Sequence, residues 1–212
     1  MGIEQPFLID VPDGWTGSRV ALRRYREGDA HLLFDAVMES QAYIREWLPW
    51  ADSYHTIEDA VEFVRRQSGH WALHGHVGMA IFSRADGTYL GATGFTVRNL
   101  AVPSFEIGYW LRHSAQGHGY MSEAVRLITA FLFDGLGAQR VSIRCDARNT
   151  RSKAVAERLG FPFEGRNRRD EIGTDGSIRD SLVYAMIPDD FANIRKAWSD
   201  DLPFPNGERA EG

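Results

Sequence analysis

The segment from Phe105 to Leu132 combines an alternating apolar stretch, a turn with two glycines and an amphipathic helix in direct succession. Large side chains alternate from Phe105 to Leu111, which is the period of a strand with one buried face. Apolar residues then recur at helical spacing, at Met121, Ala124, Val125, Ile128, Phe131 and Leu132. Glycines let consecutive N–H groups of a turn point at one spot, and a helix N-terminus adds partial positive charge. The succession therefore predicts a strand-turn-helix unit whose turn, Gln116–Met121, binds a phosphate group without needing a lysine.

The flanking segments predict an α+β fold. Arg19–Tyr25 has the pattern of a strand, and helical patterns follow through Leu32–Val37 and from Ile57. The β-rich runs Val77–Phe82, Tyr89–Val97 and Phe105–Leu111 indicate an antiparallel meander. The remaining expected elements are a strand at Val141–Cys145, a helix at Ser152–Leu159 and a hairpin whose second arm includes Leu182–Ile187. Together these give a mixed central sheet with an N-terminal meander, one βαβ crossover and a terminal hairpin.

Composition limits the domain organisation and the partners. The chain has 212 residues, of which 43% are hydrophobic, and this suits one domain with an ordinary core. We expect an N-terminal extension at 1–17, the domain at 18–188, and a surface helix with a loose tail at 189–212. The net charge of -5 provides no global positive field, so nucleic acid is not an expected partner, whereas a cationic substrate such as an amine is favoured. No apolar run approaches the roughly 20 residues that span a bilayer, so we expect no membrane association and a cytoplasmic location.

A dinucleotide site is the first alternative for the glycine turn. Gly117-x-Gly119-x-x-Ser122 imitates part of that fingerprint, and Asp146 could imitate its ribose-binding carboxylate. However, Ser122 replaces the third glycine, and Asp146 lies farther along than the roughly 20 residues expected. The upstream elements also form a meander instead of a parallel α/β unit. These departures disfavour the alternative.

Two motifs together resemble the GCN5-related N-acetyltransferase family (GNAT), and within it the RimJ/RimL-like ribosomal-protein alanine/serine N-acetyltransferase branch. Gln116, Gly119 and Met121 occupy the positions of the family's coenzyme-binding pattern, although Met121 replaces a small residue. Asn149-Thr150-Arg151-Ser152, followed by Leu159-Gly160-Phe161, matches a second family feature. The resemblance covers roughly residues 18 to 187. It implies an N-acetyltransferase that uses acetyl-CoA without a metal, with the coenzyme in a cleft between splayed strands, and it allows a homodimer.

The resemblance also implies which residues bind acetyl-CoA. The expected coenzyme segment begins with Trp110 and Leu111 at the strand end and continues through the turn, at Gln116, Gly117, His118, Gly119, Tyr120 and Met121. Asn149 and the helix after it would contact the pantetheine arm. Asn149 as a helix cap and Gly160 as a helix stop are compatible with that role.

Amine acetylation needs an uncharged amine, so a base is expected. Strand alternation places Glu106 on the face opposite Phe105 and Ile107, and its place resembles that of the catalytic glutamate of histone-type relatives. Glu171 matches the position of a carboxylate proposed as base in the RimL-like branch and is the second choice. A solvated carboxylate remains the alternative for each, and Glu106 could act through a water molecule.

The leaving thiolate needs a proton donor, and the resemblance implies Ser152. Many relatives carry a tyrosine four residues after the serine position, but this chain has Ala156 there. Because a hydroxyl is a poor acid, Ser152 would give a hydrogen bond or a relay to water. Retention of both Glu106 and Ser152 argues against a catalytically silent acyl-CoA-binding module.

The acceptor pocket is expected at Trp47-Leu48-Pro49-Trp50, where relatives of this branch build it; the tryptophans could clamp an N-terminal residue or simply pack in the core. The acceptor that the resemblance implies is the N-terminal amine of a protein such as a ribosomal protein, and a small-molecule amine such as a polyamine, amino acid or antibiotic is the alternative. The neighbouring histidines His70, His74 and His76 are not expected to hold a metal. Cys145 is expected to be a small buried core residue, with a nucleophile as the alternative.

Overall fold

The computed structural model describes residues 11–73 and 75–201. In this part of the chain, eight strands form one sheet in the order β1-β2-β3-β4-β5-β6-β8-β7. The strands are β1 (Gly14–Thr16), β2 (Val20–Arg24), β3 (His76–Ser83), β4 (Tyr89–Asn99), β5 (Ser104–Leu111), β6 (Arg140–Asp146), β7 (Phe163–Ile172) and β8 (Ile178–Met186). The helices are α1 (Ala30–Ile44), α2 (Ile57–Leu73), α3 (Tyr120–Ala130), α4 (Thr150–Arg158) and α5 (Pro188–Arg195). The expected mixed sheet, meander, crossover and hairpin are therefore confirmed.

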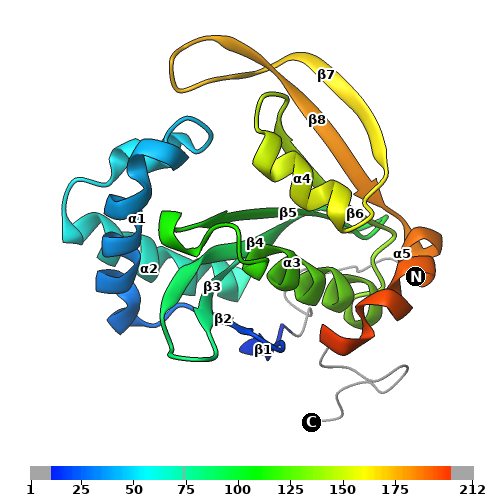
Figure 1. The fold of residues 1–212 in the computed structure, drawn as a ribbon, viewed down its shortest axis with the longest axis horizontal. Coiled ribbons are helices and arrows are strands. Elements are labelled where there is room, and N and C mark those ends of the chain that lie inside the picture. Colours follow the sequence, from blue (N-terminus) through cyan, green and yellow to red (C-terminus); the bar gives the residue numbers. More distant parts are fainter. Residues whose placement is uncertain (1–10, 74, 202–212) are drawn as a thin grey trace.

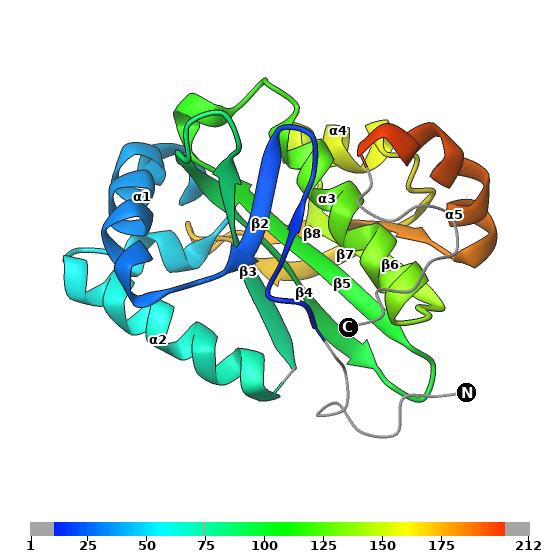
Figure 2. The same ribbon diagram turned by 90° about the horizontal axis from the view of Figure 1, so that it is seen from below.

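Helices cover both faces of the sheet, with α1 and α2 on one side and α3, α4 and α5 on the other (Figure 2). The face towards α3 buries the larger core, in which Phe95, Phe105, Ile107, Leu127 and Ile128 are almost completely inaccessible to solvent. The face towards α1 and α2 buries a second core of smaller side chains and rings. The alternation of β5 decides this division, because successive residues of a strand point to opposite faces.

The strands β5 and β6 part from one another at the centre of the sheet. They are parallel, and their pairing joins Ser104 to Arg140, Phe105 to Val141 and Glu106 to Ser142. After Glu106, β4 continues to pair with β5, and β8 continues to pair with β6 as far as Asp146. The far ends of β5 and β6 therefore leave a gap in the sheet whose apex is at Glu106.

The first and last described segments of the chain both pack into the domain. β1 lies within the segment assigned to an N-terminal extension, and it pairs antiparallel with β2. At the other end, Pro188 begins α5, where a missing N–H costs no helical hydrogen bond. Phe191 and Trp198 are buried in the α3-side core, and the Phe191 ring stacks on Phe133 at 4.6 Å between ring centroids. The C-terminal helix is thus anchored to the domain.

The β7–β8 hairpin extends from the sheet towards the end of α1 (Figure 1). β7 is an exposed edge strand, and its pairing with β8 is irregular between Asn167 and Glu171, where Arg169 has a positive φ of 57°. Such an irregularity makes an edge a poor template for another strand. Among the helices that the structure describes, none is long and apolar enough to cross a membrane.

Candidate functional site

The glycine turn has the backbone conformation that the sequence predicts. Gly117 and Gly119 have φ values of 82° and 80°, in the left-handed region that favours glycine. Gly119 is the N-cap residue of α3, directly before its first residue Tyr120. The first N–H groups of a helix have no partner within the helix, so the turn presents backbone donors at the positive end of α3. This geometry suits a phosphate group.

A buried glutamate holds the turn against the start of β2. The side chain of Glu123 is fully buried on α3, and it accepts hydrogen bonds from the backbone N–H of Arg19 (2.7 Å) and of Val20 (3.1 Å). The Arg19 guanidinium binds the same carboxylate at 2.9 Å and donates to the carbonyl of His118 at 2.9 Å. Arg19 stays half exposed beside the turn. The His118 ring stacks on Tyr120 with ring centroids 5.7 Å apart.

The N-terminus of α4 flanks the turn from the other side. Asn149 caps α4 by accepting a hydrogen bond from the Ser152 N–H at 3.0 Å, which confirms its role as a helix cap. Arg151 donates to the side chain of Gln116 at 2.9 Å, and Arg158 donates to Ser122 at 3.3 Å. Together with Arg19, two further guanidinium groups therefore surround the turn and can neutralise a phosphate in an otherwise acidic chain.

Ser152 and Tyr109 meet across the gap between β5 and β6. The Tyr109 hydroxyl lies 3.1 Å from the Ser152 Oγ and donates to the Ser152 carbonyl at 3.2 Å. Burial raises the pKa of Tyr109 well above its usual value, so the phenol keeps its proton. Burial likewise raises the pKa of the neighbouring Cys145 thiol, which agrees with a core role. Sequence reasoning missed Tyr109 because strand parity assigned it to the core, and only the gap gives it access to Ser152.

Both base candidates are ion-paired to arginines. Glu106 binds Arg98 of β4 through both carboxylate oxygens, at 2.8 and 3.2 Å, and its side chain is 25% exposed. Glu171 binds Arg144 at 2.8 Å and is 45% exposed. Glu106 is the residue where the pairing of β5 with β6 ends, so it lies at the apex of the gap. Glu171 lies on the edge strand β7, two strand positions away from β6.

The surface of β5 next to Glu106 is open to solvent at Gly108. Gly108 is exposed, and a Cβ added there would meet no atom within 4 Å. Trp110, on the same face of β5, packs edge-on against Trp50 with ring centroids 5.6 Å apart. Trp47 contacts a different partner, because the Arg148 guanidinium lies 6.0 Å from its ring centroid. The two tryptophans expected in the pocket therefore have separate partners, Trp110 of β5 for Trp50 and Arg148 for Trp47.

The side chain of Trp110 lies away from the glycine turn, in the core between the sheet and α1 and α2, whereas Leu111 packs on the α3 side. Met121 is buried in the α3-side core, which explains why a large residue is tolerated there. Within the described residues no group of three or more histidine, cysteine or acidic side chains could hold a metal. His70 and His76 lie 6.1 Å apart by ring centroid, and His74 is outside the described residues.

Known proteins resemble this chain over most of its length. Residues 19–162 match the acetyltransferase (GNAT) domain family. The chain is 28% identical over 170 residues to the ribosomal-protein-serine acetyltransferase of Escherichia coli, which covers 79% of this chain and 92% of that protein. It is 25% identical over 187 residues to the uS5-alanine N-acetyltransferase of the same species, covering 83% and 91%. A solved structure of RimL, a ribosomal L7/L12 α-N-protein acetyltransferase in complex with coenzyme A, superimposes with a TM-score of 0.75 at 25% identity, covering 86% of this chain and 98% of that one.

Proposed function

The chain belongs to the GNAT acetyltransferase family, and we propose that it transfers the acetyl group of acetyl-CoA to the N-terminal α-amino group of a protein that begins with serine or alanine. The transfer itself, from acetyl-CoA to an amine, is the activity of the family. The proposal concerns the acceptor. Similar proteins are named for acetylating ribosomal proteins at serine and alanine, which supports this choice. We also propose a cytoplasmic location, where such acceptors are made.

One observation carries the transfer chemistry of the proposal, namely that β5 and β6 part after Glu106 and leave a gap in the sheet. On the α3 side it leads to the glycine turn, the flanking arginines and the hydroxyl pair of Ser152 and Tyr109. On the other side it leads to Glu106, to the open space at Gly108 and to the contact between Trp50 and Trp110. A thioester and an amine that enter from opposite faces would meet at the gap, which is the arrangement that direct transfer requires.

The residues of the turn would hold the phosphates of acetyl-CoA. Backbone N–H groups at Gly117–Tyr120 would donate to the pyrophosphate, and Arg19 and Arg151 would add charge. Asn149 and the first turn of α4 would lie along the pantetheine arm. Coenzyme A supplies the acyl group as a thioester, and the protein supplies orientation, proton transfer and hydrogen bonds to the acyl oxygen.

Two proton transfers are needed, one from the amine on the Glu106 side of the sheet and one to the departing thiolate on the α3 side. An α-amino group has a pKa of roughly 7.7 to 8.0 and is largely protonated at neutral pH, so Glu106, directly or through water, would accept a proton before or during attack. Glu171 is the second candidate. On the other side, the Ser152 hydroxyl would donate to the departing thiolate, and the Tyr109 phenol would supply a hydrogen bond to the serine oxygen as it loses its proton. Ser152 then regains a proton from solvent.

An acceptor screen tests the proposal. The wild-type protein is supplied with acetyl-CoA and peptides that begin with serine, alanine or methionine, and coenzyme A release is followed together with peptide mass. We expect acetylation at the N-terminus of the serine and alanine peptides, and none when that amine is already blocked. Acetylation of polyamines or free amino acids with all peptides left unmodified would assign a small-molecule acceptor instead. Coenzyme A binding without transfer to any amine would leave only the non-catalytic binding role.

A further inference from the structure

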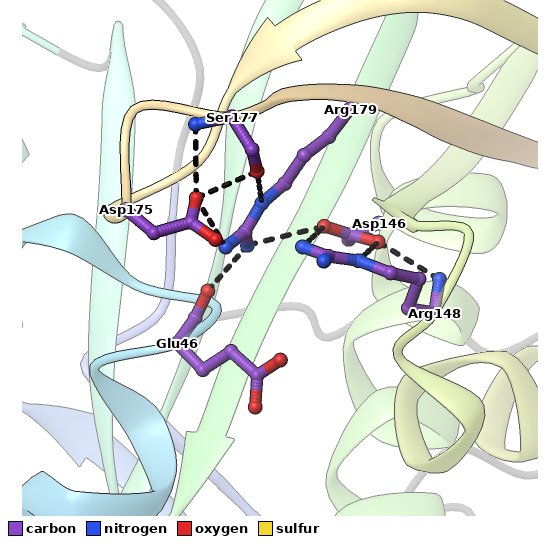
Figure 3. A network of polar contacts seen from close by, with 6 residues as sticks. All are labelled: Glu46, Asp146, Arg148, Asp175, Ser177 and Arg179. Carbon is purple, nitrogen blue, oxygen red and sulfur yellow. Dashed lines mark hydrogen bonds and ion pairs between the residues drawn. The ribbon is translucent and has the colours of Figure 1, made fainter.

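Arg179 joins the tip of the β7–β8 hairpin to the loop that carries the tryptophans. Its side chain is only 7% exposed, which is uncommon for arginine. The guanidinium donates to the carbonyl of Glu46 at 2.7 Å, to Asp146 at 3.2 Å and to Asp175 at 3.0 Å (Figure 3). Its Nε donates to the Ser177 hydroxyl at 3.2 Å. One buried cation thus contacts three segments that are far apart in the sequence.

The hairpin turn is shaped around this guanidinium. A Cβ at Gly173 would overlap the guanidinium of Arg179, so the backbone can approach closely only with glycine at that position. The turn closes through hydrogen bonds from the Gly173 N–H to the Ser177 carbonyl at 2.8 Å and from the Gly176 N–H to the Gly173 carbonyl at 2.9 Å. Ser177 also donates twice to Asp175, and these bonds hold the pKa of Asp175 below its usual value. Asp175 is therefore a permanently charged partner near neutral pH.

The contacts of Arg179 bear on Trp47 in two ways, through Glu46 and through Asp146. The carbonyl of Glu46 directly precedes Trp47, and Figure 3 shows the Glu46 carboxylate turned away from Arg179. Asp146 is shared with Arg148, whose guanidinium lies 6.0 Å from the Trp47 ring centroid. An open surface hollow of about 350 Å³ borders this junction, lined by Arg45 and Glu46 from the tryptophan loop side and by Thr174 and Asp175 from the hairpin. The position of the tryptophan loop is consequently tied to that of the hairpin.

We propose that Arg179 is a positioning residue that fixes the acceptor side of the cleft, by fastening the Glu46–Trp50 loop to the hairpin and to the end of β6. Among the described residues, the hydrogen bonds of Arg179 reach neither the glycine turn nor the Ser152–Tyr109 pair. Loss of the Arg179 side chain should therefore weaken binding of the acceptor and leave acetyl-CoA binding intact. That the loop lines the acceptor cleft rests on the proposed function.

Hydrogen exchange tests whether Arg179 holds the Glu46–Trp50 loop in place, and it needs no acceptor. The N–H groups of Trp47 and Leu48 are bonded to the carbonyl of Ile44 at 3.0 and 2.8 Å, so they report on the loop. In Arg179→Met these amides should exchange at least about tenfold faster than in the wild type, as should those of the 173–177 turn. Arg179→Lys should give the same direction of change, because an ammonium cannot reach all of the acceptors. Glu46→Ala keeps the carbonyl and should exchange like the wild type.

The matched control is Arg166→Met. Arg166 lies on the same hairpin and pairs with Asp180 at 2.6 Å, but it is 59% exposed, and among the described residues its ion pair stays within the hairpin. With a serine-starting peptide, Arg179→Met should raise the KM for the peptide about tenfold and change acetyl-CoA affinity less than about twofold. Arg166→Met should change neither. If Arg179→Met does not fold, Asp175→Asn removes one charge from an exposed partner and should give a smaller change in the same direction.

Wild-type exchange rates at Trp47 and Leu48 in the Arg179 variants would overturn the proposal. So would a parallel loss of acetyl-CoA affinity and faster exchange throughout the sheet, which would indicate a general stabilising role. If the wild type acetylates no peptide, the proposed function fails, and the exchange and acetyl-CoA measurements still decide the role of Arg179.

Discussion

A serine hydroxyl can assist a departing thiolate only if something stabilises the serine oxygen as its proton leaves. In this protein the partner is Tyr109, whose hydroxyl lies 3.1 Å from the Ser152 Oγ. Burial raises the pKa of Tyr109, so the phenol keeps its proton and can donate a hydrogen bond near neutral pH. The strand β5 and the first turn of α4 thus bring the two hydroxyls together.

Replacing Tyr109 by phenylalanine isolates this hydrogen bond. Tyr109→Phe should lower kcat roughly tenfold or more and change the KM for acetyl-CoA little, because the phenol matters most as the thiolate leaves. Ser152→Ala should lower kcat further. Steady-state kinetics of the double variant is the decisive measurement: if the two residues act as one unit, adding Tyr109→Phe to Ser152→Ala should cost almost nothing more. Fully additive losses would separate their roles.

Glu106 is the second residue whose chemistry can be tested directly. Glu106→Gln keeps the hydrogen-bonding shape but removes basicity, so turnover at neutral pH should fall by roughly 10² or more. Raising the pH should recover part of the loss, since more of the amine then arrives uncharged. Glu171→Gln is the matched control, because Glu171 also pairs with an arginine but lies on the edge strand. If only Glu171→Gln shows the slow, pH-rescued behaviour, the base lies on the hairpin.

At the scale of elements, α1 is fastened to the segment between β5 and α3. Glu39 pairs with Arg112 and accepts from the Ser114 N–H at 2.8 Å, and the Ser40 hydroxyl accepts from the His113 N–H at 2.9 Å. The Tyr43 ring stacks on His113 with centroids 4.0 Å apart. Because α1 leads into the tryptophan loop and the β5–α3 segment leads into the glycine turn, this contact couples the two sides of the cleft.

This contact should depend on pH through Glu39. The hydrogen bonds from Arg112 lower the pKa of Glu39 from 4.5 to about 2. A carboxyl whose pKa is lowered on folding stabilises the protein above its unfolded pKa, and this contribution is lost as the pH falls towards the folded value. Glu39→Gln should therefore reduce the free energy of unfolding at neutral pH by about 1 kcal/mol, because solvent screening weakens an ion pair at an exposed residue.

Denaturant unfolding across pH provides the measurement. The difference between Glu39→Gln and the wild type should be constant above pH 4.5 and shrink between 4.5 and about 2. Glu62→Gln is the control, because its i,i+4 pair with Arg66 on α2 is exposed at both ends. A difference between Glu39→Gln and the wild type that stays constant through this range would show that the ion pair adds nothing to stability.

Across the whole molecule, local patterns predicted the elements and the glycine turn, while contacts between distant segments escaped prediction. Alternation in β5 assigned Glu106 and Trp110 to one face, and that is where both lie. The same alternation could not reveal that Glu106 pairs with Arg98 or that Trp110 meets Trp50, because a face does not specify a partner. Arg179 is the clearest case, since its contact with Glu46 spans 133 residues. Such contacts depend on how strands are ordered and where they part.

The two-sided cleft makes a prediction that uses two glycines as a matched pair. Gly119 lies at the phosphate side with φ 80°, and Gly108 lies on the opposite side with open space above it. Gly119→Asp should raise the Kd for acetyl-CoA at least about 10²-fold, because a carboxylate beside the pyrophosphate adds repulsion. Gly119→Asn, which has similar size and also tolerates a positive φ, should lose much less.

Gly108→Val should spare acetyl-CoA binding and impair reaction with the amine. Its branched side chain suits a strand and meets no neighbour, so thermal stability and acetyl-CoA affinity measured by calorimetry should match the wild type. Its bulk would occupy the space over which the amine must approach Glu106, so kcat/KM for a serine-starting peptide should fall about tenfold or more. Gly165→Val, in the equally open position on the exposed hairpin, should leave both quantities unchanged. If Gly108→Val instead weakened acetyl-CoA binding and spared the peptide, the amine and the thioester would have to share one face, and the gap between β5 and β6 would not separate them.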